Sequence, residues 1–180
     1  MTQARHGTTS IALHWVIGAV LLAEVLFGFL LDDIAARGTP ARAGVINLHK
    51  SIGVVLLLLT VLRLLWRARH RAPPWPATMP AWERQAADWG HWAMYACMVL
   101  MPLFGYVASN FSKYGVKFFG IALGPWGPDM PKVYALFNGA HVATAFMFSA
   151  LLVIHVLAGL KHALIDRDQV FGRIWPGPTS

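Results

Sequence analysis

Apolar residues gather in four long runs along the chain, separated by polar segments rich in arginine, proline and glycine. The runs cover roughly residues 11–31, 45–66, 89–109 and 136–161. Each run is long enough to cross, as a helix, a hydrocarbon core about 30 Å thick. The pattern therefore predicts an all-α fold, an integral membrane four-helix bundle in which residues 1–180 form a single transmembrane domain.

Composition favours a membrane protein and argues against binding of nucleic acid. Hydrophobic residues make up 57% of the chain and charged residues only 13%, about half the charged share of a typical soluble domain. The formal net charge is +7, but the bases flank the apolar runs instead of forming one basic face. We therefore expect contact with membrane lipid and none with nucleic acid.

The distribution of bases predicts the orientation. An arginine cluster directly follows the second run, and it consists of Arg63, Arg67, Arg69 and Arg71. Because short loops rich in Lys and Arg stay on the cytoplasmic side, we expect this loop and both termini in the cytoplasm. Nine of the fifteen Lys and Arg residues then lie inside. Six lie outside, namely Arg37, Arg42, Lys50, Lys113, Lys117 and Lys132.

Histidines lie within the apolar runs. The uncharged stretch "HVATAFMFSALLVIH" has His141 and His155 at its ends, fourteen residues apart. On a helix this spacing puts both rings on nearly the same face, about 21 Å apart along the axis. Ionisable groups within spanning segments usually serve a function. In the predicted topology His14 shares the inner level with His155, and His49 shares the outer level with His141.

Two histidines from different helices at one depth suit the flat macrocycle of haem b, which takes two axial imidazoles. Zinc is the rival ligand, but it normally binds three or four side chains, and neither level offers a set of Cys or carboxylates. We therefore expect two haem b groups, one at each level. An iron with two His ligands has no open position, which suits electron transfer better than oxygen binding.

Small residues accompany these histidines. Gly18, Gly53 and Gly159 each follow a histidine by four positions, and Ala145 stands in the same place after His141. A residue four positions later lies on almost the same helix face, so a missing side chain leaves room for a planar ring. The alternative is that these residues allow close helix packing, which is common in membranes.

Other polar residues have roles that the pattern leaves open. Arg63 lies at the inner level, where it or Arg67 can pair with haem propionates or instead extend to lipid phosphates. His91 can compete with His14 as the partner of His155. Glu24, near the middle of the first run, can tune a haem, hold a proton or hydrogen-bond across the bundle.

His162 lies seven residues after His155 and therefore on the same helix face, nearer the cytoplasm. Reduction of a quinone requires protons as well as electrons, and an imidazole can supply a proton near neutral pH. A simple interfacial histidine in contact with headgroups or a loop is the alternative.

The segments "SIALHW", "NLHKSIGVVLLLLTVLRLLWR", "GHWAMYACMVLMPLFGY", "GAH" and "IHVLAGLKH" occur in this order and cover nearly the whole chain. In this set the chain resembles the bacterial cytochrome b561 family of four-helix di-haem membrane proteins. The resemblance implies that His14 with His155, and His49 with His141, bind the irons of the two haem b groups. It also implies a multi-pass protein of the bacterial inner membrane that exchanges electrons with ubiquinone, and it places His162 at the quinone side.

Characterised members of this kind oxidise superoxide at the outer face, so the resemblance implies an oxidoreductase of the superoxide:quinone type. The outer bases would attract this small anion, and Lys50 adjoins the expected ligand His49. Two alternatives remain. The chain can be a cytochrome b subunit that takes electrons from a partner dehydrogenase or hydrogenase, or a small transporter that uses its histidines and Glu24 as proton sites.

Overall fold

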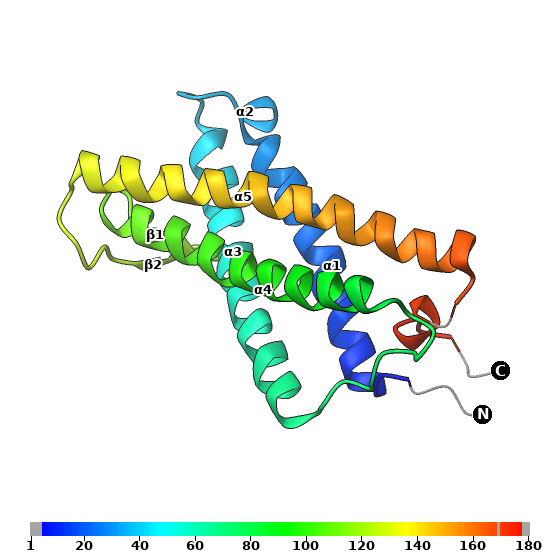
Figure 1. The fold of residues 1–180 in the computed structure, drawn as a ribbon. Coiled ribbons are helices and arrows are strands. Elements are labelled where there is room, and N and C mark those ends of the chain that lie inside the picture. The colour runs from blue at the N-terminus through cyan, green and yellow to red at the C-terminus, as the bar shows by residue number, and fades with distance from the viewer. Residues whose placement is uncertain (1–4, 169, 178–180) are drawn as a thin grey trace.

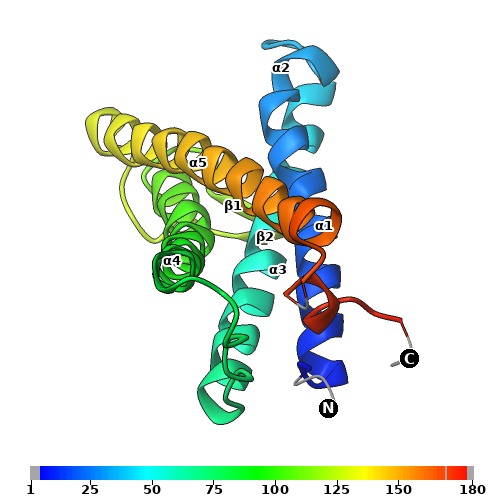
Figure 2. The same ribbon diagram turned by 45° about the vertical axis from the view of Figure 1, so that its right-hand side comes forward.

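The computed structural model describes residues 5–168 and 170–177. Its main elements are four long helices, which are α1 (Thr8–Phe29), α3 (Ala41–Arg69), α4 (Ala81–Asn110) and α5 (Pro131–Leu160). Helix α1 lies beside α3 and α4 lies beside α5, and the two pairs cross each other (Figures 1 and 2). The predicted fold class, an all-α membrane four-helix bundle, is confirmed.

The helices extend beyond the apolar runs for local reasons. Helix α4 begins directly after Pro80, eight residues before the third apolar run. Its first two turns, "AWERQAAD", are helical but polar, so the apolar run does not include them. Helix α1 ends at Phe29, and after Leu30 a single turn forms α2 (Leu31–Ile34). At the other end of the chain, α5 continues as a π-helix, η1 (Lys161–Asp166), which the 3-10 turn η2 (Phe171–Arg173) follows.

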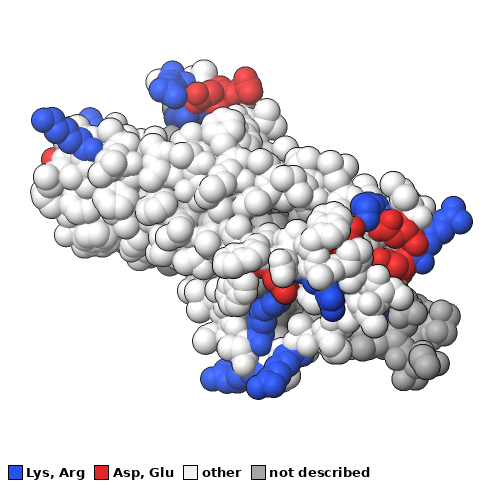
Figure 3. Space-filling view, viewed as in Figure 1, with Lys and Arg blue, Asp and Glu red and all other residues white. Residues whose placement is uncertain are grey.

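The long helices present apolar side chains to their surroundings. Within the most apolar window of each, only 11–22% of the residues are buried inside the protein. Charged side chains gather at the ends of the helices, and a wide uncharged surface lies between them on the face in Figure 3. Such a surface is stable in lipid, where the helices satisfy their own backbone hydrogen bonds.

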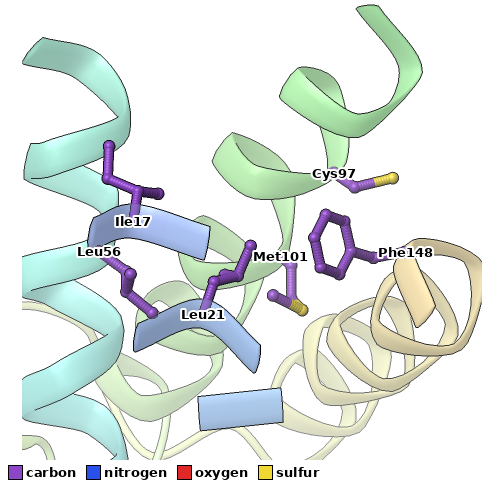
Figure 4. Close-up of a cluster of buried hydrophobic side chains, with 6 residues drawn as sticks. All are labelled: Ile17, Leu21, Leu56, Cys97, Met101 and Phe148. Carbon is purple, nitrogen blue, oxygen red and sulfur yellow. The ribbon is translucent and has the colours of Figure 1, made fainter. Parts of the chain in front are cut away.

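A small core joins the two helix pairs where they cross. It contains Ile17, Leu21, Leu56, Cys97, Met101 and Phe148, contributed by all four long helices (Figure 4). Phe148 of α5 is 1% exposed and Cys97 of α4 is equally buried. Because lipid tails are as apolar as these side chains, close packing holds the helices together here.

Both chain termini lie at one end of the bundle, which we call the termini end (Figure 1). The Trp15 indole donates to the carbonyl of Ile174 at 2.8 Å, and the His6 amide donates to the carbonyl of Arg173 at 3.2 Å. The Arg173 guanidinium donates to the carbonyl of Pro73 in the α3–α4 connection. Burial lowers the pKa of His6, and the Arg173 guanidinium lowers it further.

A short β-hairpin covers the opposite end, which we call the hairpin end. Strands β1 (Val116–Phe118) and β2 (Ile121–Leu123) pair antiparallel. They are joined by Phe119 and Gly120, both with positive φ, as in the two-residue turns that favour glycine. The fully buried Ser51 hydroxyl of α3 accepts from the Phe119 amide at 2.9 Å, and the Lys50 ammonium donates to the carbonyl of Gly115 at 2.9 Å.

The loop around α2 is held by two arginines and one aspartate. Arg42 donates to the carbonyls of Leu31 at 2.6 Å and Ala35 at 2.8 Å, and it pairs with Asp32 at 2.6 Å. Arg37 pairs with Asp32 at 3.2 Å, and its hydrogen bond lowers the pKa of that carboxyl. Two of the six expected outer bases are therefore already paired with a carboxylate.

Ser51→Ala is expected to loosen the hairpin from α3, because the substitution removes the acceptor of the Phe119 amide. Loss of a partner for a buried donor costs about 1–3 kcal/mol. Amide hydrogen exchange of the detergent-solubilised protein should speed up within β1 and β2. Ser149→Ala is the matched control, because within the described part of the chain that hydroxyl bonds only the Ala145 carbonyl of its own helix. Unchanged exchange in the hairpin of Ser51→Ala would contradict this role.

Candidate functional site

At the hairpin end the structure brings together His49 of α3 and His141 of α5. Their ring centroids lie 6.0 Å apart and their ring planes make an angle of 84°. The two residues are distant in the sequence, and they come from helices of different pairs, which cross each other (Figure 1). The crossing therefore brings the two imidazoles together.

At the termini end His14 of α1 faces His155 of α5. The centroids of these two rings lie 6.1 Å apart, with an interplanar angle of 62°. His91 of α4 also lies here, with its centroid 5.5 Å from that of His155. Three imidazoles from three helices thus gather at this depth, and both expected partners of His155 are within reach.

The spacing within each pair suits one metal ion between two imidazoles. A bond from a metal ion to an imidazole nitrogen is about 2 Å long, and the ring centre lies about 1 Å beyond that nitrogen, so imidazoles on opposite sides of one ion have centroids about 6 Å apart. The pairs His49–His141 and His14–His155 show 6.0 and 6.1 Å. The donor sets therefore fit a metal-centred macrocycle with two axial histidines.

The surroundings of His141 favour coordination through Nε2. Its Nδ1 lies 2.8 Å from the backbone carbonyl of Met101 and can donate to it. Gly105 makes this approach possible, because a Cβ at that position would lie 3.0 Å from Nδ1. With its proton held on Nδ1, the ring presents Nε2 as a free ligand.

The other imidazole at the hairpin end, that of His49, lies beside the carboxylate of Glu24. Oε1 of Glu24, on α1, lies 2.7 Å from Nδ1 of His49. The contact is within hydrogen-bonding distance, but the ring nitrogen is not aligned with the oxygen, and neither atom has another hydrogen-bond partner among the described residues. Gly28 lies against the same ring, where a Cβ would come 3.2 Å from Cε1 of His49.

A cation is the neighbour at the termini end. Arg63 donates through Nε to the Tyr95 hydroxyl at 2.9 Å, and its Nη2 lies 3.2 Å from Nδ1 of His14. Arginine has only donors, so in this contact the proton of a neutral His14 ring sits on Nε2. Binding of a metal through Nε2 requires the proton to move to Nδ1 and Arg63 to turn away. Arg63 points into the bundle and not towards headgroups.

The glycines expected beside the ligands have open surroundings. A Cβ added at Gly18 or Gly53 would meet no protein atom within 4 Å, and one at Gly159 would meet only Phe171, at 3.8 Å. Space beside His14 and His49 is consistent with a planar group there. The glycines that contact imidazoles directly are Gly28 and Gly105.

His162 lies in the π-helix η1 and is 7% exposed. Its Nδ1 is 2.7 Å from Oδ2 of Asp168 and 3.3 Å from Oδ2 of Asp166. Lys161 pairs with Asp166 at 2.5 Å and with Glu83 at 3.1 Å. Glu83, His162 and Asp166 come within 4.8 Å of one another, but the lysine already pairs with both carboxylates, so this is an ion-pair cluster around an imidazole.

Some of these residues have no clear signal in the sequence. Tyr95 and Asp168 are ordinary polar residues whose partners come from distant positions or from an irregular turn. Glu24 and Gly28 do leave a trace, because residues four positions apart share a helix face. A carboxylate and a glycine on one face of an apolar helix indicate that another polar group approaches there.

Comparison with known proteins gives one family along nearly the whole chain. Residues 5–177 match the family described as prokaryotic cytochrome b561. The chain is 31% identical to cytochrome b561 homolog 2 of Escherichia coli over 176 residues, 96% of this chain and 92% of that protein. It is 25% identical to cytochrome b561 homolog 1 of the same species over 173 residues, 96% and 97% of the two chains. It is 22% identical to the probable superoxide oxidase CybB of Yersinia pestis over 175 residues, 96% of each.

Gly105→Ala is expected to displace the His141 ring, because the new methyl group would lie 3.0 Å from Nδ1. Overpacking of this kind costs about 1–3 kcal/mol. The melting temperature of the protein in detergent should fall. Gly44→Ala in α3 is the control, because a Cβ there meets nothing within 4 Å and alanine favours a helix by up to about 1 kcal/mol. Equal melting temperatures for the two variants would count against the close approach.

Proposed function

The chain belongs to the prokaryotic cytochrome b561 family of haem-binding electron-transfer proteins in bacterial membranes, and on this basis we propose that it holds two haem b groups and carries electrons from superoxide to ubiquinone. The observation that carries the proposal is the presence of two histidine pairs, each with a spacing suited to one iron. The pairs use opposite ends of α5, about 21 Å apart along its axis.

Each bound haem b supplies an iron that takes up and releases one electron. His49 and His141 hold the group at the hairpin end, and His14 and His155 hold the group at the termini end. Gly18, Gly53 and Gly159 leave room beside three of these ligands. Arg63 lies beside His14 and is a partner for propionates, because a guanidinium forms strong paired hydrogen bonds with carboxylates.

The cytoplasmic side is assigned to the termini end. The arginine cluster closes α3 there, with Arg67 and Arg69 in the last turn of the helix. Loops rich in arginine stay in the cytoplasm, so both termini lie inside and the hairpin faces outward from a bacterial inner membrane. This orientation presents the His49–His141 pair to superoxide and the His14–His155 pair to the cytoplasmic side.

Superoxide would arrive at the hairpin end. Lys113, Lys117 and Lys132 form no ion pair within the described part of the chain and are exposed, so they create a positive field that attracts a small anion. Lys50 adds its charge beside His49, although its ammonium group also holds the Gly115 carbonyl. The name of the Yersinia pestis relative, a probable superoxide oxidase, supports this choice of donor.

Ubiquinone would be reduced at the termini end, near His162. Two superoxide anions each lose one electron and leave as dioxygen, and one ubiquinone takes up both electrons together with two protons to form ubiquinol. His162 supplies a proton to the quinone oxygen through Nε2, while Asp168 holds Nδ1 at 2.7 Å. The carboxylates at the surface of η1 connect this imidazole with water on the cytoplasmic side.

His141→Ala is expected to remove one haem and His14→Ala the other, because the two pairs lie at separate depths. Haem content per chain and the reduced-minus-oxidised spectrum of low-spin haem b measure this outcome. His91→Ala is the control, a histidine at the termini end that should leave both haems in place. Haem loss in His91→Ala but not in His14→Ala would make His91 the partner of His155. Loss of both haems from a folded His141→Ala would overturn the two-level arrangement.

The purified protein without partners should reduce a short-chain ubiquinone when superoxide is supplied. His162→Gln should lower kcat by about 100-fold, the effect of losing a general acid, and leave the dithionite-reduced spectrum unchanged. His70→Gln is the control, an exposed histidine stacked on Trp66 at the same end. Reduction of the haems by a purified dehydrogenase or hydrogenase but not by superoxide would instead favour a cytochrome subunit.

A further inference from the structure

Glu24 is a buried carboxylate within a membrane-spanning helix. It is 6% exposed, and both of its oxygens lack an aligned hydrogen bond among the described residues. A carboxylate in such surroundings is costly unless a polar group compensates it. The group that lies beside it is Nδ1 of His49, at 2.7 Å. The burial of Glu24 therefore requires an explanation that involves this imidazole.

Helix α1 positions the Glu24 carboxylate beside the His49 ring. Gly28 lies one turn after Glu24 on the same helix face, and a Cβ there would approach Cε1 of His49 to 3.2 Å. The helix thus offers the imidazole a carboxylate and, beside it, a surface without a side chain. Oε1 of Glu24 is close enough to accept an N–H from Nδ1 of His49 once the two are aligned.

The two histidine pairs have neighbours of opposite charge. At the hairpin end a carboxylate faces Nδ1 of His49, whereas at the termini end a guanidinium faces Nδ1 of His14 at 3.2 Å. The other hairpin-end ligand, His141, faces only a neutral backbone carbonyl. Among the groups that face Nδ1 of a ligand, the charge difference therefore rests on Glu24 and Arg63.

From this asymmetry we infer that Glu24 is a positioning residue for His49 that lowers the reduction potential of the hairpin-end haem. An acceptor at Nδ1 keeps the proton on that nitrogen, leaves Nε2 to bind iron and makes the imidazole a stronger electron donor. A nearby negative charge also favours ferric over ferrous iron, which carries one positive charge less. The inference rests on the proposed haem ligation by His49.

The arrangement gives electron transfer a direction. A potential lowered at the hairpin end and raised beside Arg63 at the termini end makes transfer towards the termini end downhill. This direction leads from the expected superoxide side to the expected quinone side. One buried carboxylate on α1 would therefore help to set the direction of electron transfer.

Glu24→Gln tests the inference, because the amide keeps the size of the side chain and removes its charge. In a spectroelectrochemical titration of the purified holoprotein, the midpoint potential of the hairpin-end haem should rise and that of the other haem should stay unchanged. The haem that His141→Ala loses identifies the hairpin-end component. Glu83→Gln is the matched control, the same substitution on α4 about 27 Å along the helix from Met101, and it should leave the hairpin-end potential unchanged.

An unshifted hairpin-end potential in Glu24→Gln, or an equal shift of both haems, would overturn the inference while leaving the two-haem proposal intact. If Glu24→Gln fails to retain the haem, Glu24→Asp decides, because it keeps the charge but withdraws it from Nδ1. A hairpin-end potential in Glu24→Asp that is higher than that of the wild type supports the inference. A potential equal to that of the wild type refutes it. Two haems retained in His49→Ala would instead refute ligation by His49.

Discussion

A histidine ring inside a spanning helix has two nitrogens, and each one needs a partner because lipid offers none. The structure meets this requirement by bringing imidazoles from different helices to a common depth and by placing a polar group behind most of the rings. His141 has the Met101 carbonyl, His49 has Glu24, and His14 has Arg63. The remaining nitrogens of His49 and His141 can share one iron, whereas His14 can bind an iron through Nε2 only when Arg63 turns away. The positions of Gly28 and Gly105 and the burial of Glu24 fit this requirement.

The two ends of the bundle carry different sets of polar groups. The hairpin end is closed by Ser51 and Lys50, which bind backbone groups of the hairpin beside His49. Lys113 and Lys117 remain exposed at this end. The termini end carries Lys161, His162 and Asp166 on an irregular turn of helix, with Asp168 directly after the turn and Glu83 of α4 beside it. In the function that we propose, electron entry and proton-coupled exit would be separated along α5.

Much of the architecture follows from local pattern alone. Four apolar runs predict four spanning helices, because the thickness of the bilayer fixes the length that each must have. The His141–His155 spacing predicts two levels, because the geometry of a helix is regular. The polar start of α4, the hairpin and the π-helix after α5 have no such signal, because short or polar elements depend on partners supplied by the rest of the fold.

The sequence by itself determined the helices, their alternating direction and the depth of each histidine, since these depend only on helix geometry and on the thickness of the lipid. Tertiary structure decided which groups stand behind the rings. Gly28 and Gly105, not the glycines four positions after the ligands, contact the imidazoles, and a carboxylate from α1 meets a ring from α3. These contacts join residues of different helices, and their distances depend on how helices cross and rotate, which no single segment encodes.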